Sequence, residues 1–426
     1  MVRIGPNEIS FANIEVVKDI YGQNTEFMKA PIYDTFSVPP LGIFSMRDKA
    51  THSKRRRLLS HVFSQSNLLE TEPLVREVIR RLVRRVGDSP ELPLDMLSLF
   101  RRAAFDIVGE LFLGQSFGGL DSTKQPDFLA DMESFFINSG IQGGYRWIHK
   151  FLEILPVPAI RHFLTARDRI IGYGRNAFES YIDHYGRDSG RKDLLTKFIT
   201  VKSDVGDDPL SDQEIYTEIA NLVFAGTDTT STTLTYLFWE LAKHPQLQAR
   251  LRGELRSTND SYSDGIPEFK DIQNCSLLDA CINEALRLHP AAPASLQRET
   301  PSGGKMMNGV FIPEKTVVSM QCYTTQRDPD AFNDPEAFTP ERWMTANGST
   351  PGMKALFMPY SQGTRACLGK NLAQMELKLI TSSLIGMYDV RLAPATTEES
   401  MRTKDHFLVM PKGRQCNLIF SRVAKE

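Results

Sequence analysis

The segment with the clearest capacity for chemistry is a glycine-punctuated loop, residues 360–369, with the sequence YSQGTRACLG. Its cysteine, Cys367, precedes an apolar stretch, 368–385, that we expect to be a helix. Partial positive charge and free N–H groups at a helix start favour a thiolate, the form of cysteine that binds metal. Gly363 and Gly369 leave out side chains where a flat macrocycle would need close backbone approach. The pattern indicates a metal ligand, and the alternative is a buried structural cysteine.

A second candidate lies in the middle of a long predicted helix. The helix begins at Ser211, where Ser-Asp-Gln-Glu has the spacing of a capping box, and continues to His244. Its centre carries AGTDTT, residues 225–230, within an otherwise apolar stretch. A buried carboxylate needs a partner or a changed pKa, and a threonine can bond to a carbonyl one turn earlier or admit water. Asp228 and Thr229 are therefore candidates for proton transfer to a bound ligand. The alternative is a threonine-rich packing contact.

A third pattern consists of charged residues in apolar surroundings. Glu284 and Arg287 are three residues apart and so share one helix face, and Arg342 offers a further guanidinium. Leucines and isoleucine around the pair favour burial, where only a fully bonded network is tolerated. The sequence predicts a structural clamp, with a surface ion pair as the alternative.

The composition excludes several classes of protein. The 426 residues carry a net charge of −2, so no general attraction to nucleic acid is expected. The five cysteines form no CxxC pair, which argues against a zinc site, and their scatter favours a reducing compartment over a disulfide framework. The N-terminus has neither a signal segment nor the run of roughly 18 apolar residues that spans a bilayer. The chain as it stands is expected to be soluble.

The periodicity predicts a mainly α protein. Helical spacing dominates residues 14–290, whereas 291–325 and 404–421 are expected to be β-rich portions. The start, VRIGPNEISFA, is typical of two strands joined by a turn, and the pieces FLVM and CNLIF near the end are expected to form a closing hairpin. We expect one large helical domain over residues 1–426, with small β-sheets.

Together and in this order, the three motifs resemble those of the cytochrome P-450 superfamily, and RIGPNEIS and PKGRQCNLIF look like fungal microsomal members. The chain departs at Tyr360, where phenylalanine is typical, and at His52, where many members carry tryptophan. The resemblance implies a haem-thiolate monooxygenase that holds haem b between the long helix and the cysteine loop. It implies that Asp228 and Thr229 steer protons to bound dioxygen. The implied cofactor contacts are Cys367 as metal ligand, His52, Arg56, Ala225, Gly226, Arg298, Tyr360, Gly363, Arg365 and Gly369.

The resemblance also implies a substrate and partners. We expect oxidation of a hydrophobic small molecule in fungal secondary metabolism, in a pocket that includes Ala291, Leu296, Phe407 and Leu408. Electrons should come from NADPH through a reductase that docks on the cysteine side, near Lys54, Arg55, Lys370 and Lys378. Two rivals stay open: a haem-thiolate isomerase or dehydratase acting on peroxides, and a haem-binding protein without catalysis.

The start of the chain departs from microsomal members, which begin with a membrane anchor and a first helix. We expect a full-length form to be at the endoplasmic reticulum membrane, on its cytosolic face, and to be a monomer. The shortened start puts haem retention in question, because loss of a strand exposes a sheet edge.

Overall fold

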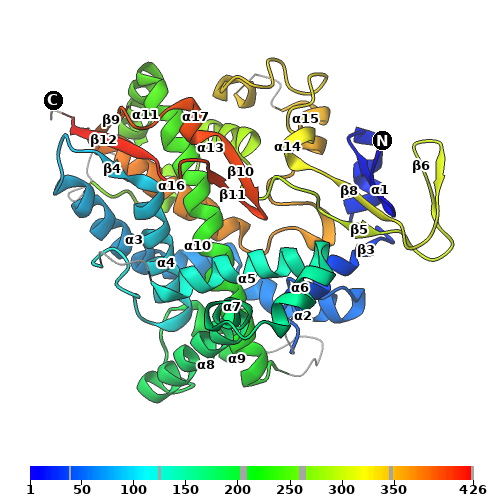
Figure 1. Cartoon of the computed structure of the whole chain (residues 1–426). Coiled ribbons are helices and arrows are strands. Elements are labelled where there is room, and N and C mark those ends of the chain that lie inside the picture. Colours follow the sequence, from blue (N-terminus) through cyan, green and yellow to red (C-terminus); the bar gives the residue numbers. More distant parts are fainter. Residues whose placement is uncertain (38–39, 123–125, 202–208, 259–264, 345–348, 424–426) are drawn as a thin grey trace.

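The computed structural model describes residues 1–37, 40–122, 126–201, 209–258, 265–344 and 349–423. Helices form most of the body, and the small sheets lie on two sides of it, one near the N-terminus and another near the C-terminus (Figure 1). The predicted mainly α class is confirmed. No helix among these residues combines the length and the apolar character that a bilayer crossing requires.

The central element is α10, Asp212–Lys243. Ser211 caps it, because its hydroxyl accepts from the Glu214 N–H at 3.3 Å while the Glu214 carboxylate accepts from the Ser211 N–H at 2.9 Å. The predicted capping box and helix bounds are confirmed. Its second half is buried, since α10 packs against α4 (Met96–Leu113), α8 (Ala166–Tyr185), α13 (Ser276–Leu288) and α16 (Lys370–Met387).

The other helices surround this core. One apolar face of α3 (Gln65–Gly87) is buried, from Val75 to Val86. The final long helix starts two residues later than predicted, because residues 363–365 form a 3-10 turn and Gly369 caps α16. The remaining α-helices are α1 (Val17–Tyr21), α2 (Lys49–Val62), α3 (Gln65–Gly87), α5 (Asp127–Gly144), α6 (Arg146–Ile154), α7 (Pro158–Leu164), α9 (Leu194–Thr200), α11 (Pro245–Thr258), α12 (Phe269–Ile272), α14 (Cys322–Thr325), α15 (Pro351–Leu356) and α17 (Glu398–Met401).

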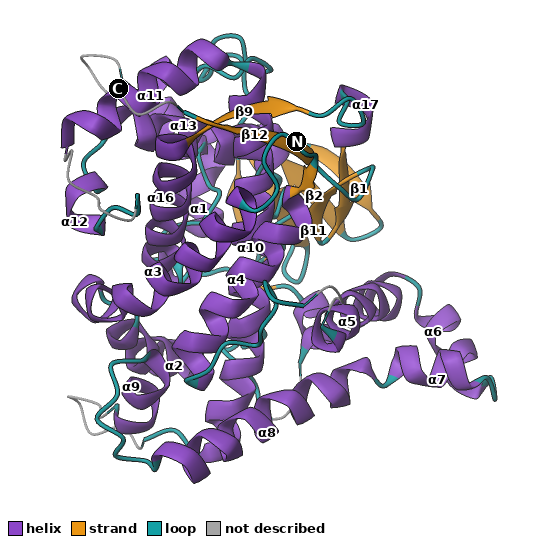
Figure 2. Ribbon diagram, turned by 90° about the vertical axis from the view of Figure 1, so that its left-hand side faces the viewer, coloured by secondary structure: helices purple, strands orange, loops and turns teal. Residues whose placement is uncertain are grey.

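In the described part of the chain, the strands form two sheets and two hairpins. Figure 2 draws these strands in orange beside the purple helices. The five-stranded sheet has the order β1-β2-β8-β5-β3, in which β2 runs parallel to β8 and β1 and β2 form the predicted N-terminal strand pair. The three-stranded sheet has the order β4-β12-β9. The bounds are β1 (Val2–Gly5), β2 (Glu8–Phe11), β3 (Met28–Lys29), β4 (Leu94–Asp95), β5 (Arg298–Glu299), β6 (Lys305–Met307), β7 (Val310–Ile312), β8 (Val317–Met320), β9 (Tyr388–Leu392), β10 (Thr403–His406), β11 (Leu408–Pro411) and β12 (Asn417–Arg422).

The predicted closing hairpin is wrong. The FLVM strand, β11, pairs with β10, whereas the CNLIF strand, β12, pairs with β4 and β9 in another sheet. The apolar strands β11 and β12 are close in sequence, which suggested that they pair with each other. The true partner of β11 is β10, which is less apolar and therefore gave a weaker strand signal. The hairpin of β10 and β11 instead directs its tip, Phe407, toward the interior.

A buried ion-pair network fixes the segment that leads to the cysteine loop. Glu284 and Arg287 have no exposed surface, and the Nε and Nη2 groups of Arg287 donate to the two carboxylate oxygens at 2.9 and 2.8 Å. Arg342 Nε, Trp343 Nε1 and the Thr339 N–H donate to the same carboxylate at 2.8 to 2.9 Å. The expected contacts among Glu284, Arg287 and Arg342 are therefore present, and they bind α13 to the chain around residue 340.

Candidate functional site

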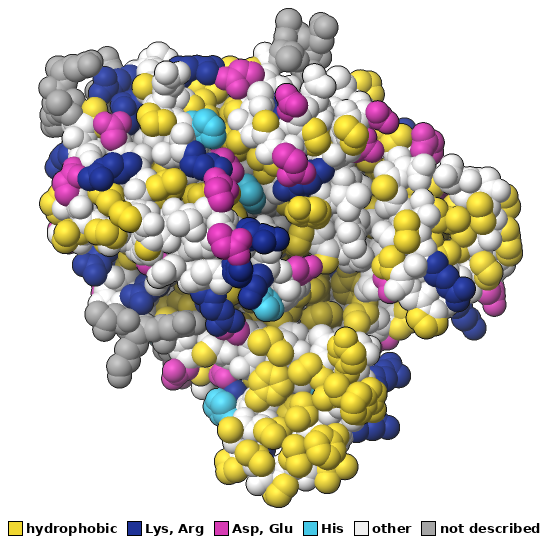
Figure 3. Space-filling view, turned by 45° about the horizontal axis from the view of Figure 1, so that its top comes forward, with side chains coloured by type: hydrophobic (Ala, Val, Ile, Leu, Met, Phe, Trp, Pro, Cys, Tyr) yellow, Lys and Arg dark blue, Asp and Glu magenta, His cyan; other side chains and the backbone are white. Residues whose placement is uncertain are grey.

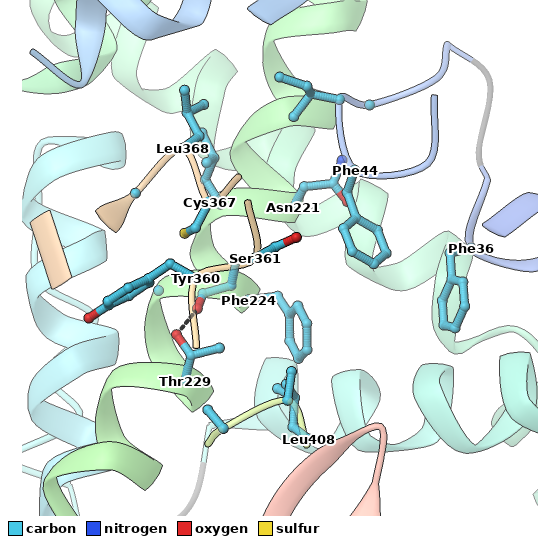
Figure 4. Close-up of a pocket in the computed structure, with 18 of the residues that line it drawn as sticks. Phe36, Phe44, Asn221, Phe224, Thr229, Tyr360, Ser361, Cys367, Leu368 and Leu408 are labelled. Atoms are coloured by element: carbon cyan, nitrogen blue, oxygen red, sulfur yellow. Dashed lines mark hydrogen bonds between the residues drawn. The ribbon is translucent and has the colours of Figure 1, made fainter. Parts of the chain in front are cut away.

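A cavity of about 400 Å³ lies between the cysteine loop and the middle of α10. Tyr360 and Cys367 line one side, and Ala225, Gly226 and Thr229 line another. Figure 4 shows residues of the loop and of α10 around one shared space. The sequence motifs at residues 225–230 and 360–369, far apart in the chain, thus meet at one cavity.

Cys367 differs from the other four cysteines in its exposure. Those four are buried, whereas Cys367 has exposed surface and lines the cavity. Burial by the surrounding protein raises the pKa of the thiol, while the Gly369 and Lys370 N–H groups and the Arg56 charge lower it. We predicted that the start of the following helix would lower the pKa of the Cys367 thiol. The protein atoms alone instead raise this pKa, because desolvation outweighs the effect of the helix N-terminus. A cationic ligand in the cavity would supply the missing stabilisation of a thiolate.

The two loop glycines serve different purposes. Gly369 lines the cavity, and a Cβ there would meet nothing within 4 Å. Gly363 does not line it: φ is +63°, and a Cβ would lie 2.1 Å from the carbonyl oxygen of Tyr21. The expected role of Gly363 beside a macrocycle is wrong, because close packing against residues 21–22 requires this glycine.

Four basic side chains gather on the cavity wall near the cysteine loop: Lys29, Arg56, Arg298 and Arg365. Burial and the charges of Arg298 and Arg365 lower the pKa of Lys29 well below its usual value, so the three arginines are the firm positive charges. Arg56 donates to the Ala366 carbonyl at 2.7 Å, and Arg365 donates to the carbonyls of Met46 and Arg47 at 2.6 and 2.8 Å. No carboxylate in the described part of the chain forms an ion pair with any of the four. Burial and the charges of Arg298 and Arg56 lower the pKa of Arg365 to about 10. This edge of the cavity therefore favours an anionic ligand.

His52 lies beside these cations. Burial, and then the charges of Arg365 and Lys29, lower its pKa to about 3. The imidazole is therefore neutral near pH 7, and it lines the cavity as a polar group without adding charge.

The donor set fits haem. A cavity-facing sulfur is available as a metal ligand, and the uncompensated cations match the two carboxylates of a porphyrin. Gly369 leaves the loop side of the cavity free of a side chain, because a Cβ there would meet nothing within 4 Å, whereas a Cβ at Gly226 on α10 would lie 2.7 Å from Val108 Cγ1.

The structure separates Asp228 from Thr229. Thr229 lines the cavity and its hydroxyl donates to the Ala225 carbonyl at 2.6 Å. Asp228 does not line it, because Arg101 on α4 binds both carboxylate oxygens at 2.6 and 3.2 Å. Adjacent helical residues point about 100° apart, and here the Asp228 side chain points toward α4 while the Thr229 side chain faces the cavity. The expected direct route from Asp228 to Thr229 is wrong for this arrangement.

Aromatic rings form the far part of the cavity. Phe136 stacks on Phe224 with centroids 4.1 Å apart, and Phe407 lies 5.0 Å from Phe136 and 5.1 Å from Phe36. Phe36, Phe136 and Phe407 also line an outer pocket of about 880 Å³. The predicted pocket residues Ala291, Leu296, Phe407 and Leu408 all line the inner cavity.

Two cavity residues escaped sequence reasoning. Lys29 comes from a two-residue strand and gave no local signal. Glu376 is a buried carboxylate on α16, and neither of its oxygens has a hydrogen-bond partner of good geometry among the described residues. Burial raises its pKa to about 8, although the nearby Thr230 hydroxyl opposes this. Its charge within the apolar run LAQMELKLI was the available signal.

Comparison with known proteins agrees with this geometry. The family model for cytochrome P450 matches residues 1–418. The chain belongs to the cytochrome P450 family. Membership makes it a haem-dependent monooxygenase, and it is similar to cytochrome P450 monooxygenase poxM of Penicillium oxalicum, with 31% identity over 95% of this chain and 80% of the relative.

Other comparisons extend the likeness. Cytochrome P450 monooxygenase orf5 of Eupenicillium brefeldianum is 32% identical over 93% of this chain and 78% of its own. The haem domain of cytochrome P450DA has a TM-score of 0.84 at 18% identity, covering 98% of this chain and 88% of that chain. The match to this haem domain shows the fold of this P450.

Proposed function

We propose that this P450 binds haem b through Cys367 and inserts one oxygen atom into a hydrophobic small molecule of fungal secondary metabolism. The observation that supports this proposal is the cavity between Cys367 and α10, which has four basic side chains at its edge and phenylalanines at its far end. When bound, haem supplies the activation of dioxygen. NADPH serves indirectly, through a reductase.

Each part of the cavity has a proposed task. Cys367 holds the metal as thiolate, and Arg56, Arg298 and Arg365, with neutral His52, hold the two carboxylates at the edge of the ring. Tyr360 supports the loop, since its carbonyl accepts from the Cys367 N–H at 2.8 Å. Ala225 and Gly226 give close approach on the α10 side, while Ala291, Leu296, Phe407 and Leu408 orient the substrate by apolar contact.

Proton movement is assigned to α10. The Thr229 hydroxyl faces the cavity and would donate there after leaving the Ala225 carbonyl. Asp228 would reach it only after release from Arg101, so we propose that opening of this ion pair precedes proton supply. Glu284, Arg287 and Arg342 act as a structural clamp.

Docking of the reductase is proposed for the cysteine side, with fewer cations than expected from sequence. Arg55 is buried and paired with Glu214 and Glu218, and Lys378 is buried and paired with Asp279. These two are therefore wrong as docking residues. Lys370 and Lys54 are exposed on α16 and α2 and keep the proposed role.

For a full-length form we propose attachment to the endoplasmic reticulum membrane on its cytosolic face. The lobe of α6 and α7 projects from the body in Figure 2, and hydrophobic side chains gather on a projecting lobe in Figure 3. Trp147, Phe151 and Ile154 on α6 are 73%, 59% and 80% exposed. Such an apolar helix face supports contact with a lipid interface.

The ligand assignment is tested by Cys367→Ala. Loss of the thiolate should abolish the red-shifted carbonyl band of the reduced haem protein, whereas Cys322→Ala, at a buried cysteine that also lines the cavity, should keep it. An unchanged band in the Cys367 variant would reject the assignment.

The proton role of Thr229 is tested by Thr229→Ala. Peroxide release should rise relative to product at equal NADPH consumption, because protonation loses its timing. Thr227→Ala is the control, since that hydroxyl donates to the Val223 carbonyl and does not line the cavity. Unchanged coupling in the Thr229 variant would remove this residue from the mechanism. Turnover of peroxides without NADPH or dioxygen would instead favour an isomerase.

A further inference from the structure

Arg167 places a charge in the apolar part of the cavity. It lies in the first turn of α8 and lines the cavity together with Ile170, Ile171 and Met132. Among the described residues, its one hydrogen bond runs from Nη1 to the Ser37 carbonyl at 3.2 Å, and no carboxylate pairs with it. A half-buried guanidinium therefore faces the substrate space with donors to spare.

Arg167 is separate from the cations near the cysteine loop. The main charges that lower the pKa of His52 are Arg365, Lys29, Arg56 and Arg298, and Arg167 is not among them. Arg167 belongs to α8, which touches α10 near Tyr216 and Ala220, toward the start of α10 (Figure 1). Arg167 donates to Ser37, whereas Arg56 and Arg365 donate to Ala366, Met46 and Arg47, so the haem carboxylates proposed for those arginines do not account for Arg167.

A second polar group lines the same cavity. Asn221 on α10 lines it, packs its amide nitrogen beside Gly42, and makes no side-chain hydrogen bond to any other described residue. Eight residues separate Asn221 from Thr229, a rise of roughly 12 Å along the helix. A ligand that contacts both Asn221 and Thr229 must therefore span about 12 Å, with a polar group beside Asn221.

We infer that this P450 takes a hydrophobic carboxylic acid, whose carboxylate pairs with Arg167 while its apolar body packs against the phenylalanines and reaches Thr229. An unpaired guanidinium prefers an anion, because a charged acceptor forms stronger hydrogen bonds than a neutral one. Asn221 lines the same cavity as a second polar group. The inference rests on the proposed function and names the substrate class of that site.

The test compares matched ligands by titration calorimetry on the haem-loaded protein. The probes are saturated fatty acids of increasing chain length and the methyl ester of each. The wild type should bind the acid more tightly than its ester. Arg167→Gln should weaken the acid about ten- to hundredfold, as expected for one charge-assisted contact, and leave the ester unchanged.

Two controls separate charge from fold. Arg175→Gln removes an exposed arginine of the same helix, stacked at 5.5 Å on Tyr216 and absent from the cavity wall, and should keep the acid preference. Equal weakening of acid and ester in Arg167→Gln would mean that Arg167 only supports the Ser37 loop, and would overturn the proposal. Equal binding of acid and ester by the wild type, or no binding of any acid, would overturn it as well.

Failure of the proposed function gives a different result. The carbonyl band reports on Cys367, whereas calorimetry reports on the acid at Arg167 and needs no metal ligation. A normal band without acid preference rejects the inference alone. An acid preference that depends on Arg167 without the band rejects the haem-thiolate proposal alone.

Discussion

Substitution of Glu284 by glutamine would test how much the buried clamp stabilises this P450. The carboxylate accepts five hydrogen bonds, two from Arg287 and one each from Arg342, Trp343 and the Thr339 N–H. Glutamine has nearly the same shape but carries no charge, and its NH₂ group would face donors instead of accepting from them. Two arginines would then lack their shared counter-charge.

The magnitude follows from burial. Glu284 and Arg287 have no exposed side-chain surface, and Arg342 is 9% exposed. Removing one partner of such a pair costs about 3–5 kcal/mol, because the remaining charge stays desolvated. Against a usual total of about 5–15 kcal/mol, this loss is a large fraction of the free energy of unfolding.

The assay is urea unfolding followed by far-ultraviolet circular dichroism, with Glu341→Gln as the matched control. Glu341 pairs with Arg250 at 2.6 Å, but both side chains are about half exposed. The control should therefore lose less than about 1 kcal/mol. Equal losses in the two variants would refute the reasoning that burial, rather than the ion pair itself, sets the cost.

Three further predictions concern the cavity. Burial raises the pKa of Glu376 from 4.5 to about 8, so the folded wild type binds one more proton than the unfolded chain between these pH values. The free energy of unfolding of the wild type should therefore fall as the pH rises through this window. Urea titrations should show that Glu376→Gln gains stability relative to the wild type over the same window. Asp228→Asn breaks the ion pair with Arg101 and should lower the free energy of unfolding by about 1–3 kcal/mol in the same assay. The variant should also form product more slowly while keeping its carbonyl band. Unchanged turnover would exclude Asp228 from proton supply. Phe407 has a φ of +80° at the tip of its hairpin, a conformation that glycine adopts more readily than alanine. Phe407→Gly should therefore be about 1 kcal/mol more stable than Phe407→Ala by thermal unfolding. A less stable glycine variant would contradict the assigned backbone strain.

Sequence alone determined the features that depend on local spacing. The bounds of α10 followed from the capping box at Ser211 and the helical period up to His244, because a cap and an apolar stripe involve residues within a few turns of one another. The three motifs identified the family for the same reason: their spacing and order are properties of the chain itself.

Tertiary structure decided which groups meet and how strongly each is desolvated. The partner of Asp228 is Arg101, 127 residues away, and Lys29, Arg56, Arg298 and Arg365 converge from separate parts of the chain. The pKa of Cys367 is raised by burial, a many-residue effect that opposes the local helix start. Long-range packing and solvent exclusion depend on residues brought together by folding, so the spacing of a motif does not contain them.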